Sequence, residues 1–287
     1  MATMDLHGKV ALVTGGDRGI GLATSRALLA RGANVVMVGL HQDHVDQAAA
    51  QLHDSRVLGL VADVTDPGAL QRVVATTVAH FGHLDVVVAN AGIASRAATF
   101  QAMASEPFDR VLDVNLMGVH HTVRAALPEI LRNRGHIALV ASIYAFTNGM
   151  GTIPYAMSKA GVEQLGRALR VELAPHGVTT TVAYFGFVDT HLVREALDAD
   201  PVVEELQATF PAALLKRLTP QAAGESLVLA VEGRKPRLIT PRRWIPLFVL
   251  RGIAGPYLDR RAARDPATQA IVRRLDERSG EEQPTTA

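Results

Sequence analysis

Short β-branched runs alternate with helix-length intervals along most of the chain, and this alternation restricts the fold more than any other feature. Runs with strand character lie at residues 9–14, 34–38, 57–61, 85–89, 136–141, 178–183 and 237–240. Helical patterns lie between them at residues 20–31, 43–53, 67–81, 106–134, 154–175 and 220–231. Strands separated by helices form parallel βαβ units, and strands that are apolar on both sides need helices on both faces. The sequence therefore predicts an α/β fold with one doubly wound parallel sheet, which binds ligands beyond the carboxyl ends of its strands.

Charge and cysteine content exclude several classes of protein. The 287 residues include no cysteine, so disulfides and thiolate metal sites are excluded. With a formal net charge of +1, the chain lacks the excess of basic residues that is typical of a nucleic-acid-binding protein. The N-terminus has no basic stretch followed by an apolar core, and we expect a cytoplasmic protein. The charge is uneven, however, because residues 1–233 carry 17 basic and 22 acidic side chains, whereas residues 234–278 carry 12 basic and 4 acidic.

A glycine-rich turn follows the first predicted strand and opens a helix: Thr14-Gly15-Gly16-Asp17-Arg18-Gly19-Ile20-Gly21. Glycine at this spacing lets the backbone turn tightly and approach a pyrophosphate, and the helix N-terminus presents free N–H groups to the phosphates. An ordinary βα turn is the alternative interpretation. As cofactor-binding residues in this turn we expect Gly15, Asp17, Arg18, Gly19, Ile20 and Gly21.

Cofactor choice depends on the end of the second strand, where an acidic residue would bind the ribose hydroxyls of NAD and repel the 2′-phosphate of NADP. The chain has Gly39-Leu40-His41 there and no acid. Arg18 can pair with the phosphate and His41 can add a donor, so NADP(H) is favoured and NAD(H) stays open. Arg18 as an exposed turn residue and His41 as a polar loop residue are the alternatives.

Two further strand ends carry cofactor candidates. Asp63 and Val64 follow the third strand and are expected to hold the adenine amino group. Asn90, Ala91 and Gly92 follow the fourth strand and are expected to line the cofactor with small groups.

A second constellation has the composition of an acid–base site. Tyr155 and Lys159 are four residues apart, so they share one face of a helix. A nearby ammonium lowers the pKa of a tyrosine from its usual value of roughly 10 toward neutrality. Ser142 ends the fifth strand and can hydrogen-bond a substrate oxygen, and Asn115 can bind a water that links Lys159 to solvent. The alternatives are an interface tyrosine, a surface lysine, a loop-capping serine and an asparagine at a helix kink.

These motifs together resemble the classical short-chain dehydrogenase/reductase family, from about Lys9 to Thr190. The resemblance rests on TGGDRGIG, Asp63-Val64, Asn90-Ala91-Gly92, Asn115, Ser142 and Tyr155-Ala156-Met157-Ser158-Lys159. It implies a Rossmann sheet with strand order 3-2-1-4-5-6-7 and a catalytic tetrad of Asn115, Ser142, Tyr155 and Lys159. It also implies that Tyr155 exchanges a proton with the substrate oxygen, and that Lys159 binds the nicotinamide ribose.

The chain departs from the family pattern after the sixth strand, where Phe185-Gly186 replaces the usual Pro-Gly. We expect Gly186, Val188 and Thr190 still to bind the cofactor, with the Phe185 ring near the nicotinamide. The segment 190–218 has the length of a lid. The resemblance implies a catalytic domain at residues 1–240, followed by an extension at 241–278. We expect this extension to be helical and the tail at 279–287 to be disordered.

The residues expected around the substrate are mostly apolar, which favours a hydrophobic ketone or secondary alcohol. They are Ile93, Ser95, Ser142, Tyr144, Phe146, Met150, Phe185 and Leu192. Core packing is the alternative for several of them, and a catalytically silent NADP-binding regulatory or structural protein is the alternative function.

The basic extension is also too apolar to stay solvated. Its apolar side chains are Trp244, Ile245, Leu247, Phe248, Val249, Ile253, Tyr257 and Leu258. We expect them to cover the substrate mouth or a neighbouring subunit of a dimer or tetramer, with contact to a membrane surface a less favoured alternative.

Overall fold

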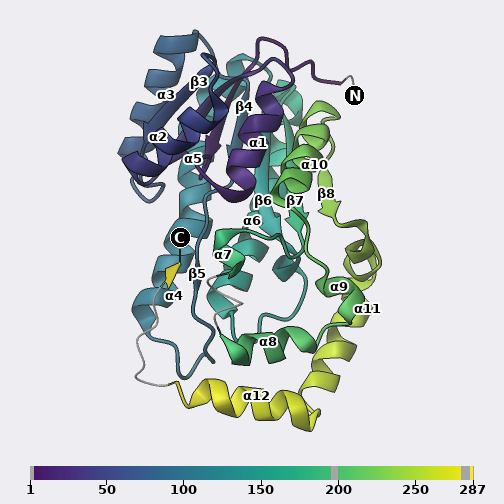
Figure 1. The fold of residues 1–287 in the computed structure, drawn as a ribbon. Helices are drawn as coiled ribbons and strands as arrows, with labels where there is room; N and C mark the ends of the chain where they lie inside the picture. The colour runs from purple at the N-terminus through teal and green to yellow at the C-terminus, as the bar shows by residue number, and fades with distance from the viewer. Residues whose placement is uncertain (1–2, 195–199, 279–284, 287) are drawn as a thin grey trace.

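A sheet of seven parallel strands runs through the centre of the computed structural model, which describes residues 3–194, 200–278 and 285–286 (Figure 1). The strand order β3-β2-β1-β4-β6-β7-β8 confirms the predicted order, since a two-residue strand, β5 (Ala94–Ser95), lies outside this sheet. Every neighbouring pair is parallel. The strands are β1 (Val10–Thr14), β2 (Asn34–Gly39), β3 (Val57–Val61), β4 (Val86–Ala89), β6 (His136–Ser142), β7 (Thr179–Phe185) and β8 (Arg237–Thr240).

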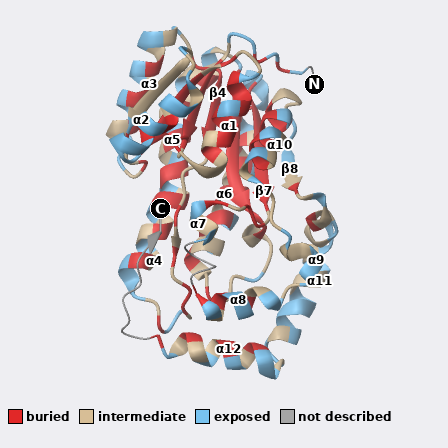
Figure 2. Cartoon of the chain, viewed as in Figure 1, coloured by how far each residue is buried: buried red, intermediate tan, exposed pale blue. Residues whose placement is uncertain are grey.

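Helices cover both faces of the sheet, as the apolar strands require. Ala11 and Val13 point into one core with α1 (Gly19–Leu29), α2 (Gln42–Leu52) and α10 (Pro220–Glu232). Val10 and Leu12 point into the other core with α3 (Pro67–Phe81), α5 (Gly118–Arg132) and α6 (Ile153–Glu172). Figure 2 shows the buried sheet between these two helical layers. The alternation of side chains along each strand therefore supplies both cores.

Capping residues explain the helix boundaries that the sequence predicts well. The Asp66 carboxylate accepts a hydrogen bond from the Gly68 N–H, Pro67 occupies the first turn, and Gly82 ends α3 with φ 85°. Thr219 and Pro220 begin α10 in the same way. The predicted bounds of α3 therefore agree with the structure at both ends.

The prediction of one continuous helix at residues 106–134 is wrong. The structure has α4 (Ser105–Leu112), a π-helical turn (Asp113–Met117) and then α5. The π turn carries Asn115, whose side-chain oxygen accepts a hydrogen bond from the Ile93 N–H at 2.8 Å and whose amide donates to the Ile93 carbonyl at 2.9 Å. A π-bulge re-aims side chains in this way, often at functional sites.

The segment predicted as a lid contains α7 (His191–Val193), α8 (Pro201–Ala208) and α9 (Ala212–Leu215), and its residues 195–199 lie outside the described residues. The extension forms α11 (Ile245–Ala262) and α12 (Pro266–Asp276). Two residues of the tail predicted to be disordered form β9 (Thr285–Thr286), which pairs antiparallel with β5. Residues 279–284 and 287 lie outside the described residues. Among the described residues, no helix combines the length and the hydropathy that a transmembrane span needs.

A buried ion pair fastens the end of the extension to the main domain. Arg278 donates two hydrogen bonds of 2.6 Å to the Asp200 carboxylate and one of 2.7 Å to the Ala97 carbonyl. Burial alone would raise the pKa of Asp200, but the hydrogen bonds and charge of Arg278 hold it below its usual value. The pair therefore joins α12, the start of α8 and the chain after β5.

We expect Arg278→Ala to lower the free energy of unfolding by about 3 kcal/mol, because the buried Asp200 carboxylate loses its two short hydrogen bonds and keeps Arg96, at 3.9 Å, as a more distant charged partner. The matched control is Arg274→Ala, four residues earlier in the last turns of α12, since Arg274 pairs with Glu205 at the surface and its loss should cost less than about 1 kcal/mol. Urea unfolding at pH 7 measures both. The contribution of Asp200 should be complete above pH 3.8, its ordinary pKa, and be lost as the pH falls toward the lowered folded value. Equal losses for the two variants would contradict a structural role of the buried pair.

Candidate active site

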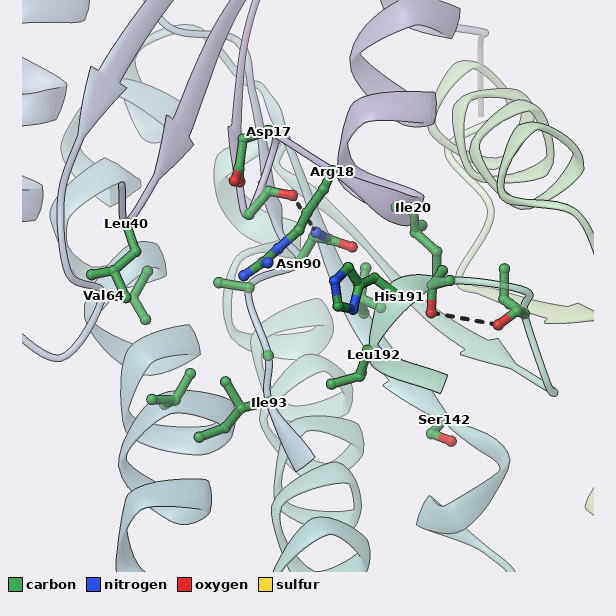
Figure 3. A pocket seen from close by; sticks show the side chains of 18 of the residues that line it. Asp17, Arg18, Ile20, Leu40, Val64, Asn90, Ile93, Ser142, His191 and Leu192 are labelled. Atoms are coloured by element: carbon green, nitrogen blue, oxygen red, sulfur yellow. Dashed lines mark hydrogen bonds between the residues drawn. The ribbon is translucent and has the colours of Figure 1, made fainter. Parts of the chain in front are cut away.

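A cavity of about 250 Å³ lies at the carboxyl ends of the strands, from the glycine turn to the start of α6 (Figure 3). It brings together most of the predicted site. Its lining includes the predicted residues Gly15, Asp17, Arg18, Gly19, Ile20, Asp63, Val64, Asn90, Ala91, Gly92, Ile93, Ser142, Tyr155, Lys159, Phe185, Gly186, Val188, Thr190 and Leu192.

The glycine turn needs glycine for two physical reasons. Gly15 and Gly19 have φ values of 59° and 53°, which L side chains rarely adopt. A Cβ at Gly21 would lie 1.8 Å from the Gly15 carbonyl oxygen, so Gly21 supports packing behind the cavity and does not line it. Arg18 is the N-cap residue of α1, and within the described residues its side chain forms no capping hydrogen bond with the first N–H groups of the helix. The first N–H groups of α1 therefore stay available to an anion.

Asn90 ties the glycine turn to the end of β4. Its side-chain amide donates to the carbonyls of Thr14 and Gly15 at 3.0 and 3.1 Å. A Cβ at Gly15 would lie 3.0 Å from the Ala91 Cα, so the two segments are in close contact. The predicted Asn90-Ala91-Gly92 segment thus forms one wall of the cavity.

Asp63 lies on the side of the cavity next to β3. The Thr65 N–H and hydroxyl donate to one of its oxygens at 2.9 and 2.8 Å, and Arg110 of α4 lies 3.4 Å from the other. Burial raises the pKa of Asp63, but these hydrogen bonds and the charge of Arg110 outweigh it and lower the pKa overall. Sequence reasoning missed Arg110, because it is 47 residues from Asp63 and no local motif marks it.

A carboxylate does lie at the end of β2, although the sequence lacks an acid there. The Asp17 side chain reaches across from the glycine turn, and a Cβ at Gly39 would lie 2.9 Å from its Cγ. The Asp17 side chain is 5% exposed, and His44 Nδ1 lies 4.0 Å from its carboxylate. His41 is exposed and does not line the cavity. The glycine at position 39 was the sequence signal for this arrangement, because a strand end without a side chain leaves room for a side chain from another segment, here Asp17.

Ser142, Tyr155 and Lys159 meet at the opposite end of the cavity from Asp17. Ser142 ends β6, and its oxygen also accepts a hydrogen bond from the Tyr144 N–H at 3.3 Å. Lys159 Nζ donates to the Val140 carbonyl at 3.1 Å and lies 5.4 Å from the centre of the Tyr155 ring. The helical spacing of Tyr155 and Lys159 therefore does place both at one point, beside the end of β6.

Burial dominates the protonation of this group. It raises the pKa of Tyr155, and a hydrogen bond with Ser142 opposes that rise. The same burial lowers the pKa of Lys159 to about 8. The expected net lowering of the Tyr155 pKa by Lys159 is therefore wrong for this structure, because desolvation penalises the charged form of both groups.

Asn115 is fully buried behind Gly92 and does not line the cavity. Both polar groups of its side chain bond to the backbone of Ile93. A Cβ at Gly92 would lie 3.2 Å from the Asn115 oxygen and 3.6 Å from Lys159 Nζ. Asn115 thus holds the Gly92–Ile93 backbone beside Lys159.

A smaller cavity of about 80 Å³ adjoins the first at Ser142 and Tyr155. Predicted substrate residues Ser95, Tyr144 and Leu192 line it, and its described lining has no charged side chain. Phe146 and Met150 line neither cavity. Phe146 packs against Tyr184 and Phe248, and Met150 packs with α8 and α12, so the core interpretation holds for these two.

The extension supports this end of the site through Trp244. A Cβ at Gly186 would lie 2.6 Å from the indole Nε1, and the fully buried Trp244 ring packs against Phe187, which lines the smaller cavity. Thr190 accepts a hydrogen bond from the Val193 N–H at 3.3 Å and so begins α7. The position of Gly186 in the cavity wall therefore depends on a residue beyond β8.

Comparison with known proteins agrees with this geometry. A family model described as short chain dehydrogenase matches residues 9–201. The chain belongs to the short-chain dehydrogenase family. Members similar to it include 3-oxoacyl-[acyl-carrier-protein] reductase FabG of Escherichia coli (strain K12), 33% identical over 68% of this chain and 80% of that protein. L-fucose dehydrogenase of Rattus norvegicus is 32% identical over 77% of this chain and 82% of its own length.

A solved structure of a short-chain type dehydrogenase/reductase from Mycobacterium marinum shares the fold with a TM-score of 0.73. It has 28% sequence identity, and the match covers 82% of this chain and 94% of that chain. As a short-chain dehydrogenase, the protein is an oxidoreductase that acts on CH–OH or C=O groups with NAD(P). The extension at 241–278 lies outside the residues that the family model matches.

We expect Gly186→Ala to lower the melting temperature and weaken dinucleotide binding, because its new methyl group would overlap the rigid Trp244 indole. Trp244→Phe removes the atoms that overlap, so the double variant should recover much of the loss. Thermal unfolding and dinucleotide titration of all four proteins give the coupling between the two sites. Strictly additive effects would contradict the contact.

Proposed function

We propose that the protein interconverts a ketone and a secondary alcohol on a largely apolar substrate, with Tyr155 as the acid and base. The observation that carries this proposal is the junction of the two cavities at Ser142 and Tyr155. One cavity has the glycine turn of a dinucleotide site at its far end, and the other is apolar. A carbonyl group placed at the junction would meet both the hydroxyls and the cofactor.

The lining of the larger cavity fits a dinucleotide. The glycine turn and the uncapped start of α1 suit its pyrophosphate, and the ionised Asp63 suits an amino group of its adenine. When bound, the nicotinamide supplies or accepts the hydride. The chain's own residues position the substrate and handle the proton.

Tyr155 is the proton donor of the reduction in this proposal. Because burial raises its pKa, the phenol is protonated at neutral pH and can donate to a carbonyl oxygen. Ser142 donates a second hydrogen bond to that oxygen, which stabilises the negative charge that develops on it. Lys159, with a pKa lowered to about 8, is still mostly protonated at neutral pH and can return a proton to Tyr155.

Tyr144 supports an apolar substrate with a polar carbonyl. Its ring meets the Tyr155 ring edge-on at 5.8 Å, and burial raises the pKa of Tyr144 to about 12. Tyr144 is therefore a donor that keeps its proton throughout the reaction. Apolar residues, Ala94 and Ala97 among them, form most of the remaining wall, which suits a hydrocarbon chain or ring.

Two opposite charges, Asp17 and Arg18, line the end of the cavity that would take the adenosine ribose in this proposal. Arg18 favours NADP(H), the cofactor we propose, because a guanidinium can pair with a 2′-phosphate. Asp17 opposes it, because its carboxylate lies where an acid would bind the ribose hydroxyls. We therefore propose that Asp17 limits the preference for NADP(H) and leaves NAD(H) usable.

We expect Tyr155→Phe to lower turnover by about a thousandfold, the usual size of a lost acid–base group. The dissociation constant for NADPH should change by less than about threefold, since the ring stays in place. Tyr144→Phe is the matched control, and it should keep turnover within about tenfold of wild type. NADPH oxidation with a panel of apolar ketones measures the rates. Normal turnover by Tyr155→Phe would exclude the mechanism, and NADPH binding without turnover by the wild type would favour the silent regulator.

We expect Asp17→Asn to raise the ratio of kcat/KM for NADPH to that for NADH by about tenfold, because it removes a negative charge beside the 2′-phosphate. Arg18→Gln should lower the same ratio by a similar factor. Steady-state kinetics with one ketone and both cofactors measures the ratio. An unchanged ratio in Asp17→Asn would exclude Asp17 from cofactor selection.

A further inference from the structure

The helix α11 has an apolar surface without a partner in the described chain. All 18 of its residues are described, and none of them is buried. The described residues include twelve exposed large apolar side chains, and five of these lie on α11 itself, in the ten-residue stretch 249–258. They are Val249, Leu250, Ile253, Tyr257 and Leu258. Such a concentration marks an interaction surface, whereas exposed apolar side chains that are scattered singly need no explanation.

The opposite side of α11 is fixed to the protein, so this apolar surface faces outward. Phe248 packs 5.1 Å from the Tyr184 ring and 4.6 Å from the Arg251 guanidinium. Arg251 in turn donates hydrogen bonds of 2.9 and 2.8 Å to the Glu163 carboxylate on α6. Figures 1 and 2 show α11 at the margin of the molecule with exposed residues along it.

Cations extend the same surface toward the C-terminal end of the helix. Val249, Ile253 and Tyr257 follow one another at four-residue steps, so they form one stripe, and Arg261 is the next step along it. Arg260 is also exposed beside them. Of the neighbouring acids, Asp259 accepts a hydrogen bond from Asn148, whereas Asp265 caps α12 and also interacts electrostatically with Arg261. The stripe therefore combines apolar side chains with a positive end, where Asp265 offsets the charge of Arg261 only in part.

We propose that this stripe, defined by Val249, Leu250, Ile253, Tyr257, Arg260 and Arg261, docks the protein on an anionic lipid bilayer surface. Apolar side chains flanked by arginines suit the boundary between acyl chains and anionic headgroups. A second copy paired in parallel on the same stripe would bring the arginines of both copies together, and one paired antiparallel would set them at the two ends of the interface, opposite the apolar Val249 end and without an anionic partner on the stripe. Charge complementarity thus favours the lipid surface, and the inference is independent of the proposed reaction.

The test is co-sedimentation of the full chain with vesicles of phosphatidylcholine alone and of phosphatidylcholine mixed with phosphatidylglycerol. Wild type should bind the mixed vesicles more tightly, and added salt should weaken that binding. Arg260→Gln combined with Arg261→Gln should weaken it by about fivefold per arginine. Ile253→Glu should weaken it by at least about tenfold, because an 80% exposed isoleucine loses its burial in lipid.

Val171→Glu is the matched control, since Val171 is 74% exposed on α6 and lies outside the stripe. It should bind vesicles as wild type does, and thermal unfolding should show that every variant folds. Absence of binding to the anionic vesicles, or unchanged binding by Ile253→Glu, would overturn the proposal. Light scattering in the absence of lipid supplies a further outcome: a wild-type dimer that Ile253→Glu converts to monomer, without vesicle binding, would assign the stripe to a second copy.

Discussion

The close approach of the glycine turn to the end of β4 is the contact on which the site depends. Gly21 lies against the Gly15 carbonyl, where a Cβ would be 1.8 Å from its oxygen, and Asn90 bonds to the carbonyls of Thr14 and Gly15. These contacts fix the start of α1 at the end of β1, so the free N–H groups of α1 face the cavity. The same contacts set the position of Ala91 and Gly92, and Gly92 lies beside Lys159. One tightly packed turn thus relates the proposed phosphate end of the site to its proposed catalytic end.

The extension supports the other half of the site. Trp244 packs against Gly186, and Arg278 binds the Ala97 carbonyl and Asp200. Gly186 and Ala97 both line the smaller cavity. The family model stops before the extension, at residue 201, so these two supports belong to a part of the chain that the shared family pattern does not specify. Substrate selection and the Gly186 side of the dinucleotide site are therefore expected to depend on the extension, whereas the glycine turn depends on the shared sheet.

Patterns of local sequence predicted the sheet order, the helices on each face and most of the dinucleotide cavity. They succeeded because each signal, such as Asp66 and Pro67 before α3, acts within a few residues. They failed where a contact joins distant segments. Asp17 fills the space above Gly39, and Arg110 reaches Asp63 from α4. Neither pairing has a local signature.

The predicted substrate residues show the same limit. Phe146 and Met150 lie near Tyr144 in the sequence and are apolar, which suits a cavity wall and a core equally well. Their outcome was decided by α8, α11 and α12, whose side chains pack against them. The break in the helix at Asn115 has a similar origin, because the partner that stabilises the π turn is the backbone of Ile93, 22 residues away.

Burial acts in opposite directions on the two titratable groups of the proposed reaction. It raises the pKa of Tyr155 and lowers that of Lys159 to about 8, because both charged forms lose solvation. Burial therefore shifts both groups toward their neutral forms, although Lys159 stays mostly protonated at neutral pH, and a protonated Tyr155 is the form that reduction of a carbonyl requires. Oxidation of an alcohol requires the phenolate, so raising the pH should favour oxidation. The apolar surroundings that suit a hydrophobic substrate thus also bias the acid–base group toward reduction at neutral pH.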